Sequence, residues 1–573
     1  MIISKPALRN TAAIVIAIIF GYHAAAAYDF MADNVYYTIS GGNAYVTYAS
    51  SDYNSYSGDI VIPDSITNGT VTYPVTGIMA YAFYLSTGLT SVTVGNCVKD
   101  IGSYAFDGCT ALTEVKLGSA VETIAERAFG QCTALTQLEL PNSVYALGKS
   151  LFYCCTALKK VNLPEGITIM NSRMFNGCTS IDSIFLPEGV TEIGTLFFNN
   201  CSSLKTITMS DNVTSIGQKA FSYCTSLESL TLSQGLTSIA TEAFSYCSGL
   251  KSLSIPSGVT TLGQYTFRYC SALESVEFPN TLKSIGTAAF EGAGLKSLYL
   301  PDSLDSLALS VFKDCVYLES VRISNNLTTL KAYTFDNDSN ITYFSMGGLQ
   351  SLDYYSLRYS GPLDSIEFTD NLTEIRSYAF WGSKIKSITI PSTVTSLGSA
   401  FVYCYDLESV VIPDGVTELA QYLFRDCTAL KTVTIEGCPD VKVYAFKNCT
   451  ALTDIYCKTA TPPNCLSTLV FYGTDAANTA ILHIPTGSRD AYASATVWQD
   501  FLNVVEEDYT DSNSEDNDEG AVTSVVVDCN VVSEEFFTVS GTQVAKPIDS
   551  EKAIYIVVRT YEDGSVKTIK EVH

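Results

Sequence analysis

Residues 224–244 read CTSLESLTLSQGLTSIATEAF and contain one complete unit of a pattern that fills most of the chain. Leu227, Leu230 and Leu232 have the L-x-x-L-x-L spacing, which places the last two on one face of a short strand. A second apolar pair follows, such as Val259 and Leu262 in the next unit. Each unit then ends in an x-x-Ala-Phe element, which predicts a turn of α-helix or 3₁₀-helix.

Phenylalanine returns at a fixed interval. Ten phenylalanines from Phe83 to Phe290 are separated by nine intervals of 23 residues, and the series continues with small insertions and deletions to Phe446. A cysteine column has the same phase and contains Cys109, Cys132, Cys155, Cys178, Cys201, Cys224, Cys247, Cys270, Cys315, Cys404, Cys427 and Cys449. A unit with one apolar edge is stable only when it stacks on its neighbours. The sequence therefore predicts a repeat solenoid of the leucine-rich type, with about 17 units.

The consensus C-x-x-L-x-x-L/V-x-L/I-P-x-x-V-x-x-I/L-G-x-x-A-F, found between about residues 60 and 456, closely resembles the BspA-like leucine-rich repeat, also called the Treponema pallidum type. This resemblance implies a secreted or surface protein of a Bacteroidetes-like bacterium, and a few members of the family are adhesins. The pattern departs from the consensus at Ala293, where the cysteine is missing, and over residues 336–363, where Leu357 replaces phenylalanine. We expect the stack to bend or loosen in this second stretch.

The flanking segments indicate an exported chain with capped ends. Residues 1–27 have Lys5, Arg9, a short apolar stretch and a final Ala25-Ala26-Ala27, which predicts a signal peptide. The apolar stretch is too short to serve as a membrane anchor, so we expect no transmembrane span in the mature chain. Residues 28–77 are predicted to form an N-terminal cap, residues 78–456 the solenoid, and residues 457–505 a C-terminal cap with a helix around residues 491–498.

The end of the chain has a different composition. Residues 506–519 include eight acidic residues, and we predict an acidic linker at 506–520 rather than a calcium loop, because Asp516 lies where such a loop needs glycine. Residues 521–573 predict a small β module with strands at 522–527, 536–539, 553–559 and 565–572 and a hairpin at Asp563-Gly564. Parts of it, residues 537–544 and 554–557, resemble the C-terminal sorting domains of secreted Bacteroidetes proteins, although Ala553 departs from their usual glycine. A passive terminal domain is the alternative.

Charge and motifs exclude several classes of function. Lys and Arg total 33 against 59 Asp and Glu, a formal net charge of -26, and such a surface repels nucleic acid and anionic lipid. The histidines are His23, His483 and His573, and neither a metal motif, a cofactor motif nor a nucleophile motif is present in the sequence. We therefore predict a protein that is not an enzyme and needs no cofactor. A hydrolase with an unrecognised carboxylate pair is the least favoured alternative.

The cysteines suggest packing more than cross-linking. The column repeats every 23 residues, so we expect its thiols to be free, buried and stacked between units as small hydrophobic groups. Cys457 and Cys465 lie outside the column, in the predicted C-terminal cap. They are the pair predicted to form a disulfide.

The outward strand positions give two candidate contact surfaces. Short hydroxyl side chains dominate the middle of the predicted rod, for example Thr206, Thr208, Ser252 and Ser254, and these also suit an exposed strand with no partner. Aromatic residues gather in the second half, and the predicted binding residues are Tyr333, Tyr354, Tyr355, Tyr359, Trp381, Tyr403 and Tyr405. Core packing of these rings is the alternative. The partner would be an extracellular protein or glycan; a structural spacer is the second hypothesis, and the oligomeric state is left open.

Overall fold

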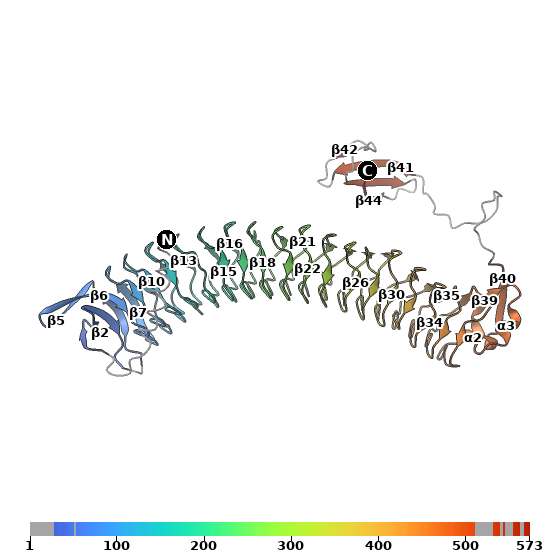
Figure 1. Ribbon diagram of the computed structural model, residues 1–573, viewed down its shortest axis with the longest axis horizontal. Helices are drawn as coiled ribbons and strands as arrows, with labels where there is room; N and C mark the ends of the chain where they lie inside the picture. Colours follow the sequence, from blue (N-terminus) through green and yellow to red (C-terminus); the bar gives the residue numbers. More distant parts are fainter. Residues whose placement is uncertain are drawn as a thin grey trace, which may run out of the picture. The chain divides into compact units, whose positions relative to one another are not determined.

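The structure is a computed structural model that describes residues 28–50 and 53–509, which belong to one compact unit. It also describes four strands of a second compact unit, which begins at Thr510. Residues 28–509 form a gently curved β-solenoid of about 19 turns with almost no helix (Figure 1). The predicted leucine-rich solenoid is thus confirmed. The predicted signal peptide, residues 1–27, lies outside the described residues.

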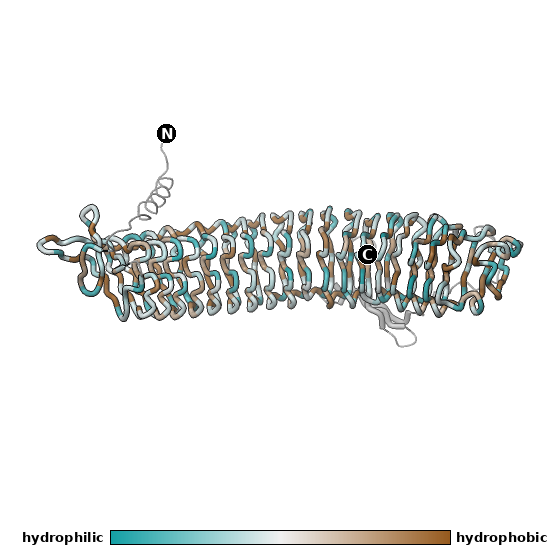
Figure 2. The backbone as a smooth tube through the Cα atoms, turned by 90° about the horizontal axis from the view of Figure 1, so that it is seen from below, coloured by the Kyte–Doolittle hydropathy of each residue, from teal (hydrophilic) through white to brown (hydrophobic). Residues whose placement is uncertain are grey.

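Most turns contribute two short strands, and each strand pairs in parallel with its equivalent in a neighbouring turn. In the turn that begins near Cys247, β19 (Ser252–Ser254) presents Ser252 and Ser254 to solvent and buries Leu253, and β20 (Thr261–Leu262) buries Leu262. The side-chain alternation of a strand places every second residue on the inner face. Figure 2 shows the resulting hydrophobic positions, which recur in turn after turn along the tube.

We call the first set of strands the long ladder. Its strands are β4 (Ser57–Ile62), β7 (Gly88–Val94), β9 (Glu114–Lys116), β11 (Gln137–Glu139), β13 (Lys160–Asn162), β14 (Ser183–Phe185), β16 (Thr206–Thr208), β19, β21 (Ser275–Glu277), β23 (Ser297–Tyr299), β25 (Ser320–Arg322), β27 (Tyr343–Ser345), β29 (Ser365–Glu367), β31 (Ser387–Thr389), β33 (Ser409–Ile412), β35 (Thr432–Ile435), β37 (Asp454–Cys457), β39 (Ile481–Pro485) and β40 (Asn503–Glu507).

The second set forms the short ladder. Its strands are β6 (Val71–Ile78), β8 (Asp100–Ile101), β10 (Thr123–Ile124), β12 (Ala146–Leu147), β15 (Glu192–Ile193), β17 (Ser215–Ile216), β18 (Ser238–Ile239), β20, β22 (Ser284–Ile285), β24 (Ser306–Leu307), β26 (Thr329–Leu330), β28 (Ser351–Leu352), β30 (Glu374–Ile375), β32 (Ser396–Leu397), β34 (Glu418–Leu419), β36 (Asp440–Val441) and β38 (Asn464–Cys465). Most pairs join residues 23 positions apart, as in Thr261 with Ser284.

The x-x-Ala-Phe element is not helical, and that part of the prediction was wrong. It forms consecutive tight turns in which the residues two before and two after nearly every column phenylalanine have left-handed backbone angles, for example Glu242 (φ 58°) and Tyr246 (φ 61°). The N–H groups of Glu242, Phe244 and Tyr246 donate to carbonyls of the next turn, and equivalent bonds continue from Tyr81 to the carbonyl of Tyr472. A helix would satisfy these donors internally and leave none for the neighbouring unit.

Phenylalanine and cysteine fill the core beside these turns. Phe244 is fully buried, and its ring centroid lies 5.1 Å from that of Phe221 and 5.4 Å from that of Phe267. The cysteines of the column are buried free thiols. Each donates to the phenylalanine carbonyl one unit back, as Cys224 Sγ does to Phe198 at 3.2 Å. Burial raises the pKa of Cys224 well above its ordinary value, so the thiol stays protonated as the donor.

The stack does not loosen around Leu357, contrary to our expectation. Leu357 is fully buried and its N–H donates to Ala379, while β28 and β30 pair in register. Phe344 in β27 packs edge-on against Phe335, with ring centroids 5.3 Å apart. The long ladder is less continuous in the first half of the solenoid. The unit at residues 224–244, for example, has no strand at residues 229–231.

Both ends of the solenoid are covered. At the N-terminus, β1 (Phe30–Ala32), β2 (Val35–Ser40) and β3 (Asn43–Thr47) form an antiparallel meander that joins the short ladder through β6, and β5 (Ser65–Asn68) pairs with β6. At the C-terminus, the cap contains α2 (Ala476–Thr479), α3 (Arg489–Ala493) and η1 (Trp498–Asp500). Trp498 is buried, and its Nε1 donates to the Pro463 carbonyl at 2.7 Å. The helix predicted at 491–498 is therefore two short pieces.

The last strand of the solenoid extends beyond residue 506, the predicted start of the acidic linker. Glu506 and Glu507 belong to β40, whose backbone pairs with that of β39. Acidic side chains are compatible with this strand, because it is the outer edge of the ladder and leaves them partly or fully exposed to solvent. In the second unit, β41 (Val531–Thr538), β42 (Gln543–Val544), β43 (Ile554–Tyr561) and β44 (Val566–Val572) form an antiparallel sheet in the order β42-β41-β43-β44. The predicted strand 522–527 and the turn at Asp563-Gly564 lie outside the described residues.

Candidate binding surface

The predicted aromatic residues lie on the turns that flank the phenylalanine column. Tyr333 and Tyr355 lie two residues before the column position, and Tyr359 and Tyr403 lie two residues after it. All four have left-handed backbone angles, with φ between 54° and 63°. This conformation costs free energy for a residue with a side chain. The stacking of the turns is what holds these rings at regular positions.

Rings of successive turns touch and, with Arg425 bridging Tyr403 and Tyr422, form a line that we call the turn ridge. It consists of Tyr333, Tyr355, Tyr378, Trp381, Tyr403, Tyr422, Tyr444 and Tyr472. Tyr355 lies 5.2 Å from Tyr333 and 5.2 Å from Tyr378, centroid to centroid, with interplanar angles of 10° and 18°. Trp381 continues the line to Tyr403 at 5.3 Å.

Arginines bridge the rings, and sequence reasoning missed them. The Arg358 guanidinium lies over Tyr333, Tyr355 and Tyr359 at 5.3–5.4 Å and makes two 2.7 Å hydrogen bonds to Asp336. Arg425 links Tyr403 to Tyr422 in the same way. The signal was present in the sequence, because the residue directly after the column position is basic at Arg268, Lys313, Arg358, Arg425 and Lys447.

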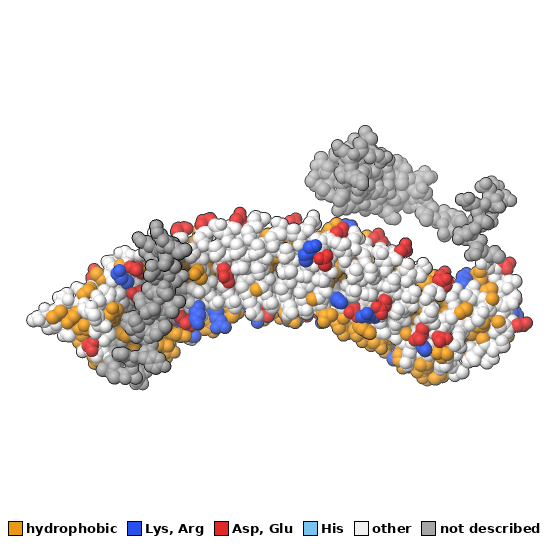
Figure 3. Space-filling view, viewed as in Figure 1, with side chains coloured by type: hydrophobic (Ala, Val, Ile, Leu, Met, Phe, Trp, Pro, Cys, Tyr) orange, Lys and Arg blue, Asp and Glu red, His pale blue; other side chains and the backbone are white. Residues whose placement is uncertain are grey.

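The ridge is partly accessible from solvent, since Tyr472 is 53% exposed and the other ridge residues are half-buried. Tyr354, Tyr359 and Tyr405 are 48%, 47% and 55% exposed, and the other predicted residues are half-buried, so none of the seven is a core residue. Tyr405 packs beside Tyr403, whereas Tyr354 stands apart from the ring stack and contacts Arg376. Figure 3 shows hydrophobic side chains, a class that includes tyrosine, gathered along the inner edge of the arc in its second half.

The stacking of the rings determines which atoms of the ridge a partner can contact. Because neighbouring rings cover each other's faces, the line offers ring edges and phenol hydroxyls more than open faces. Partial burial and the neighbours Tyr378 and Tyr333 raise the pKa of Tyr355 above its ordinary value. The hydroxyl therefore stays protonated at neutral pH and can donate as well as accept.

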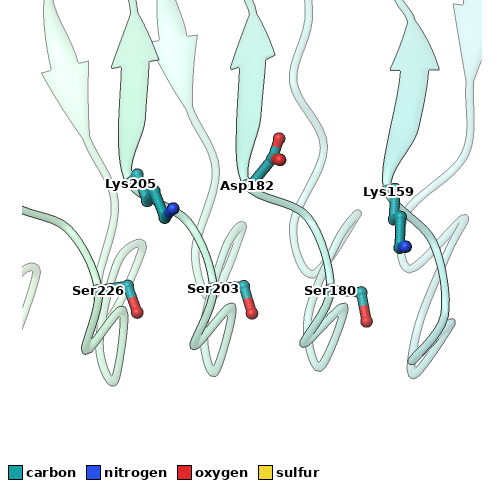
Figure 4. A pocket seen from close by; sticks show the side chains of 6 residues that line it. All are labelled: Lys159, Ser180, Asp182, Ser203, Lys205 and Ser226. Atoms are coloured by element: carbon teal, nitrogen blue, oxygen red, sulfur yellow. The ribbon is translucent and has the colours of Figure 1, made fainter.

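The hydroxyl-rich middle of the rod is a second, flatter surface. A shallow polar depression there is lined by Lys159, Ser180, Asp182, Ser203, Lys205 and Ser226 (Figure 4). It has no deep wall and no cluster of apolar side chains, both of which small-molecule sites usually have. This surface suits a broad contact and does not suit an enclosed small ligand.

His483 is held as a structural residue in the C-terminal cap. Its Nδ1 lies 2.6 Å from Glu507 Oε1 and its Nε2 lies 3.1 Å from Asp454 Oδ1, and the ring stacks on Tyr456 at 4.0 Å. The hydrogen bond from His483 lowers the pKa of Asp454. Both ring nitrogens thus tie neighbouring strands of the long ladder together.

The remaining predicted site is the pair of cysteines in the C-terminal cap. Cys457 in β37 and Cys465 in β38 are both buried free thiols in the structure, and their disulfide stays a prediction. Within residues 28–50 and 53–509, no group of three His, Cys, Asp or Glu side chains could hold a metal ion. In the part of the chain that the structure describes, no helix is long and apolar enough to cross a membrane.

Comparisons with known proteins agree with the repeat. Six overlapping segments, spanning residues 76–205, 147–274, 191–318, 237–363, 289–402 and 350–476, match the family model described as the BspA type leucine-rich repeat region. A search of curated proteins found no match.

Three solved structures illustrate the similarity. A leucine-rich repeat protein from Bacteroides ovatus is 23% identical, with 75% of this chain and 94% of that chain covered and a TM-score of 0.40. The T. pallidum leucine-rich repeat protein is 26% identical over 35% of this chain and 90% of its own, with a TM-score of 0.31. The pneumococcal vaccine antigen PcpA is 18% identical over 83% and 98%, with a TM-score of 0.35.

Proposed function

Because the chain belongs to the BspA type leucine-rich repeat family, we propose that it is a secreted or cell-surface binding protein that contacts an extracellular protein through the turn ridge. The observation that carries this proposal is the unbroken line of aromatic and arginine side chains from Tyr333 to Tyr472. The predicted signal peptide at residues 1–27 supports the location.

The chemistry of the ridge favours a protein over a glycan. Tyrosine, tryptophan and arginine are the residues that most often carry binding energy in protein interfaces. Their stacked arrangement here keeps side chains such as Tyr355 ordered before a partner arrives, which reduces the entropy lost on binding. A glycan that stacks on open ring faces would find most of them covered by the neighbouring ring.

The test is a binding array of extracellular matrix proteins, bacterial surface proteins and glycans, probed with the purified full chain. A triple variant, Tyr355→Ala, Trp381→Ala and Tyr403→Ala, removes three rings of the ridge itself. We expect at least about a tenfold loss of affinity, since one truncated anchor costs about 2 kcal/mol or more.

The matched control replaces Tyr223, Tyr299 and Tyr317 by alanine. These rings are 45%, 59% and 58% exposed and lie before the ridge in the chain. Their removal should leave affinity within about twofold of the parent. An equal loss in both triples, or no partner in the whole array, would contradict the proposal, and the second outcome would favour the structural spacer.

A further inference from the structure

A column of alternating charge runs along the middle of the rod. In eight successive units, the residue directly before the long-ladder strand position is charged, and its sign alternates without a break. The basic members are Lys159, Lys205, Lys251 and Lys296. The acidic members are Asp182, Glu228, Glu274 and Glu319. We call these eight residues the charge column.

The backbone aligns the column directly. From Lys205 to Glu319, the N–H of each member donates to the carbonyl of the member one unit before it, at 2.8–3.4 Å. All eight side chains are exposed. Two ion pairs form between neighbours, Lys251 with Glu228 at 3.1 Å and Lys296 with Glu274 at 2.8 Å. The side chains therefore form a regular row with a spacing of about 4.8 Å per unit.

The row is self-complementary. Reversing a sequence of four positive and four negative charges in strict alternation places an opposite charge at every position. A two-fold axis between Glu228 and Lys251 would set Glu228 against Lys251 of a second copy, and Lys159 against Glu319 of that copy. Closed two-fold dimers are the commonest homo-oligomers, and their interfaces are self-complementary in this sense.

The ends of the row match as well. Thr136 precedes Lys159 in the same hydrogen-bonded column, and Thr342 follows Glu319. The two-fold axis would place these uncharged residues opposite each other, so that no like charges meet at either end. Elsewhere the chain carries a formal net charge of -26 and its copies repel each other. The charge column itself sums to zero.

We infer that the charge column is a self-association surface on which two copies of this chain pair antiparallel. Exposed ion pairs contribute little energy individually, so the row mainly sets orientation and register. The hydroxyl side chains beside it, such as Ser252 and Ser275, make the flat contact. This inference does not rest on the proposed binding function.

Zero-length carbodiimide cross-linking of the parent protein tests the register. A Lys159–Glu319 bond cannot form within one chain, because seven units separate these residues by about 34 Å. We expect this cross-link, together with Lys205–Glu274, in a species of twice the monomer mass. A protein that stays monomeric in sedimentation velocity at about 0.05 M salt, with only neighbouring-unit cross-links, overturns the inference.

Charge reversal supplies the second test. The all-acid variant Lys205→Glu, Lys251→Glu and Lys296→Glu and the all-base variant Asp182→Lys, Glu228→Lys and Glu274→Lys should each return to the monomer mass. Mixing them should restore a dimer that contains one copy of each. The control variant Lys149→Glu, Lys219→Glu and Lys283→Glu has the same charge change on other columns and should still dimerise. A mixture without heterodimer overturns the inference, provided circular dichroism shows both variants folded.

Discussion

Replacing Asp338 by cysteine should stabilise the solenoid at neutral pH. Asp338 lies three residues after Phe335, which is the position of the column cysteines, and it is fully buried. Its Oδ1 accepts the Cys315 N–H at 2.7 Å, but its Oδ2 has no hydrogen-bond partner. Burial, with smaller contributions from Asp314 and Asp336, raises its pKa well above the ordinary value.

The pH dependence follows from the direction of that shift. A carboxyl whose folded-state pKa is raised contributes its full stability below the unfolded-state pKa of about 3.9 and loses it as the pH rises through the folded-state value. A cysteine at this position would lose no stability between about pH 4 and pH 7, because its thiol stays protonated there. The advantage of Asp338→Cys should therefore be small near pH 4 and grow toward pH 7, where an unsatisfied buried group costs about 1–3 kcal/mol.

The replacement leaves no new unpaired backbone group. The Cys315 N–H also donates to the Phe312 carbonyl at 3.2 Å, and in the other units the column thiol donates to a phenylalanine carbonyl. Amide hydrogen exchange of the peptides around residues 330–365 is the assay, because repeat proteins open locally. Exchange at pH 7 should slow by about 5-fold to 150-fold, since 1.4 kcal/mol is a factor of ten.

Asp305→Asn is the control, because the Asp305 side chain is 58% exposed and its removal should change local stability by less than about 0.5 kcal/mol. Equal exchange rates for Asp338→Cys and the parent at pH 7 would refute the reasoning. So would a gain that is larger near pH 4 than at pH 7.

Three further predictions concern the core and the C-terminal cap. Phe244→Ala should cost about 3–5 kcal/mol, measured by denaturation and exchange, whereas alanine at Phe185, which is 56% exposed, should cost less than about 0.5 kcal/mol; similar costs would contradict the stacked core. His483→Phe should keep the ring contact with Tyr456 but lose about 1.5–3 kcal/mol, and because the pKa of Asp454 is lowered in the folded state, the parent's advantage should shrink as the pH falls below about 3.9. A parent advantage that does not change with pH would exclude this assignment. Intact-mass analysis after alkylation under non-reducing conditions should find Cys457 and Cys465 protected as a disulfide, and full alkylation of both after denaturation would disprove the pairing.

The inner face of the solenoid was readable from the sequence, because burial imposes a period on residue type. Phe244, Leu253 and Leu262 are inward residues that the 23-residue spacing identifies by itself. The hydrogen bonds along the turns were not readable. Left-handed angles at Glu242 and Tyr246 leave no mark in residue type, although glycine, the usual signal, occupies the position two residues after the phenylalanine in other units, at Gly108, Gly177, Gly292 and Gly382.

The contact surfaces were only partly predictable for a related reason. The aromatic residues of a stretch with irregular spacing predict Tyr333 and Tyr355 as contact residues, but the stacking of these rings depends on the equivalence of their positions in successive turns. Arg358 and the charge column are recognised only when residues at the same position of successive units, polar positions included, are compared with one another. In a solenoid, residues 23 apart are neighbours, so polar periodicity carries as much spatial information as apolar periodicity.

The two proposed surfaces occupy different parts of the rod, and this has a consequence for binding strength. The charge column covers the units from Lys159 to Glu319, whereas the turn ridge begins at Tyr333 and lies on the turns beside the phenylalanine column. An antiparallel pair centred between Glu228 and Lys251 would therefore place one ridge toward each end of the pair. Two ridges on one assembly would bind a multivalent partner with greater avidity than either alone, or join two separate partners. The charge column would then strengthen binding at the ridge without touching the ligand, and the all-acid variant should lose avidity for an immobilised partner while retaining its affinity for the same partner in solution.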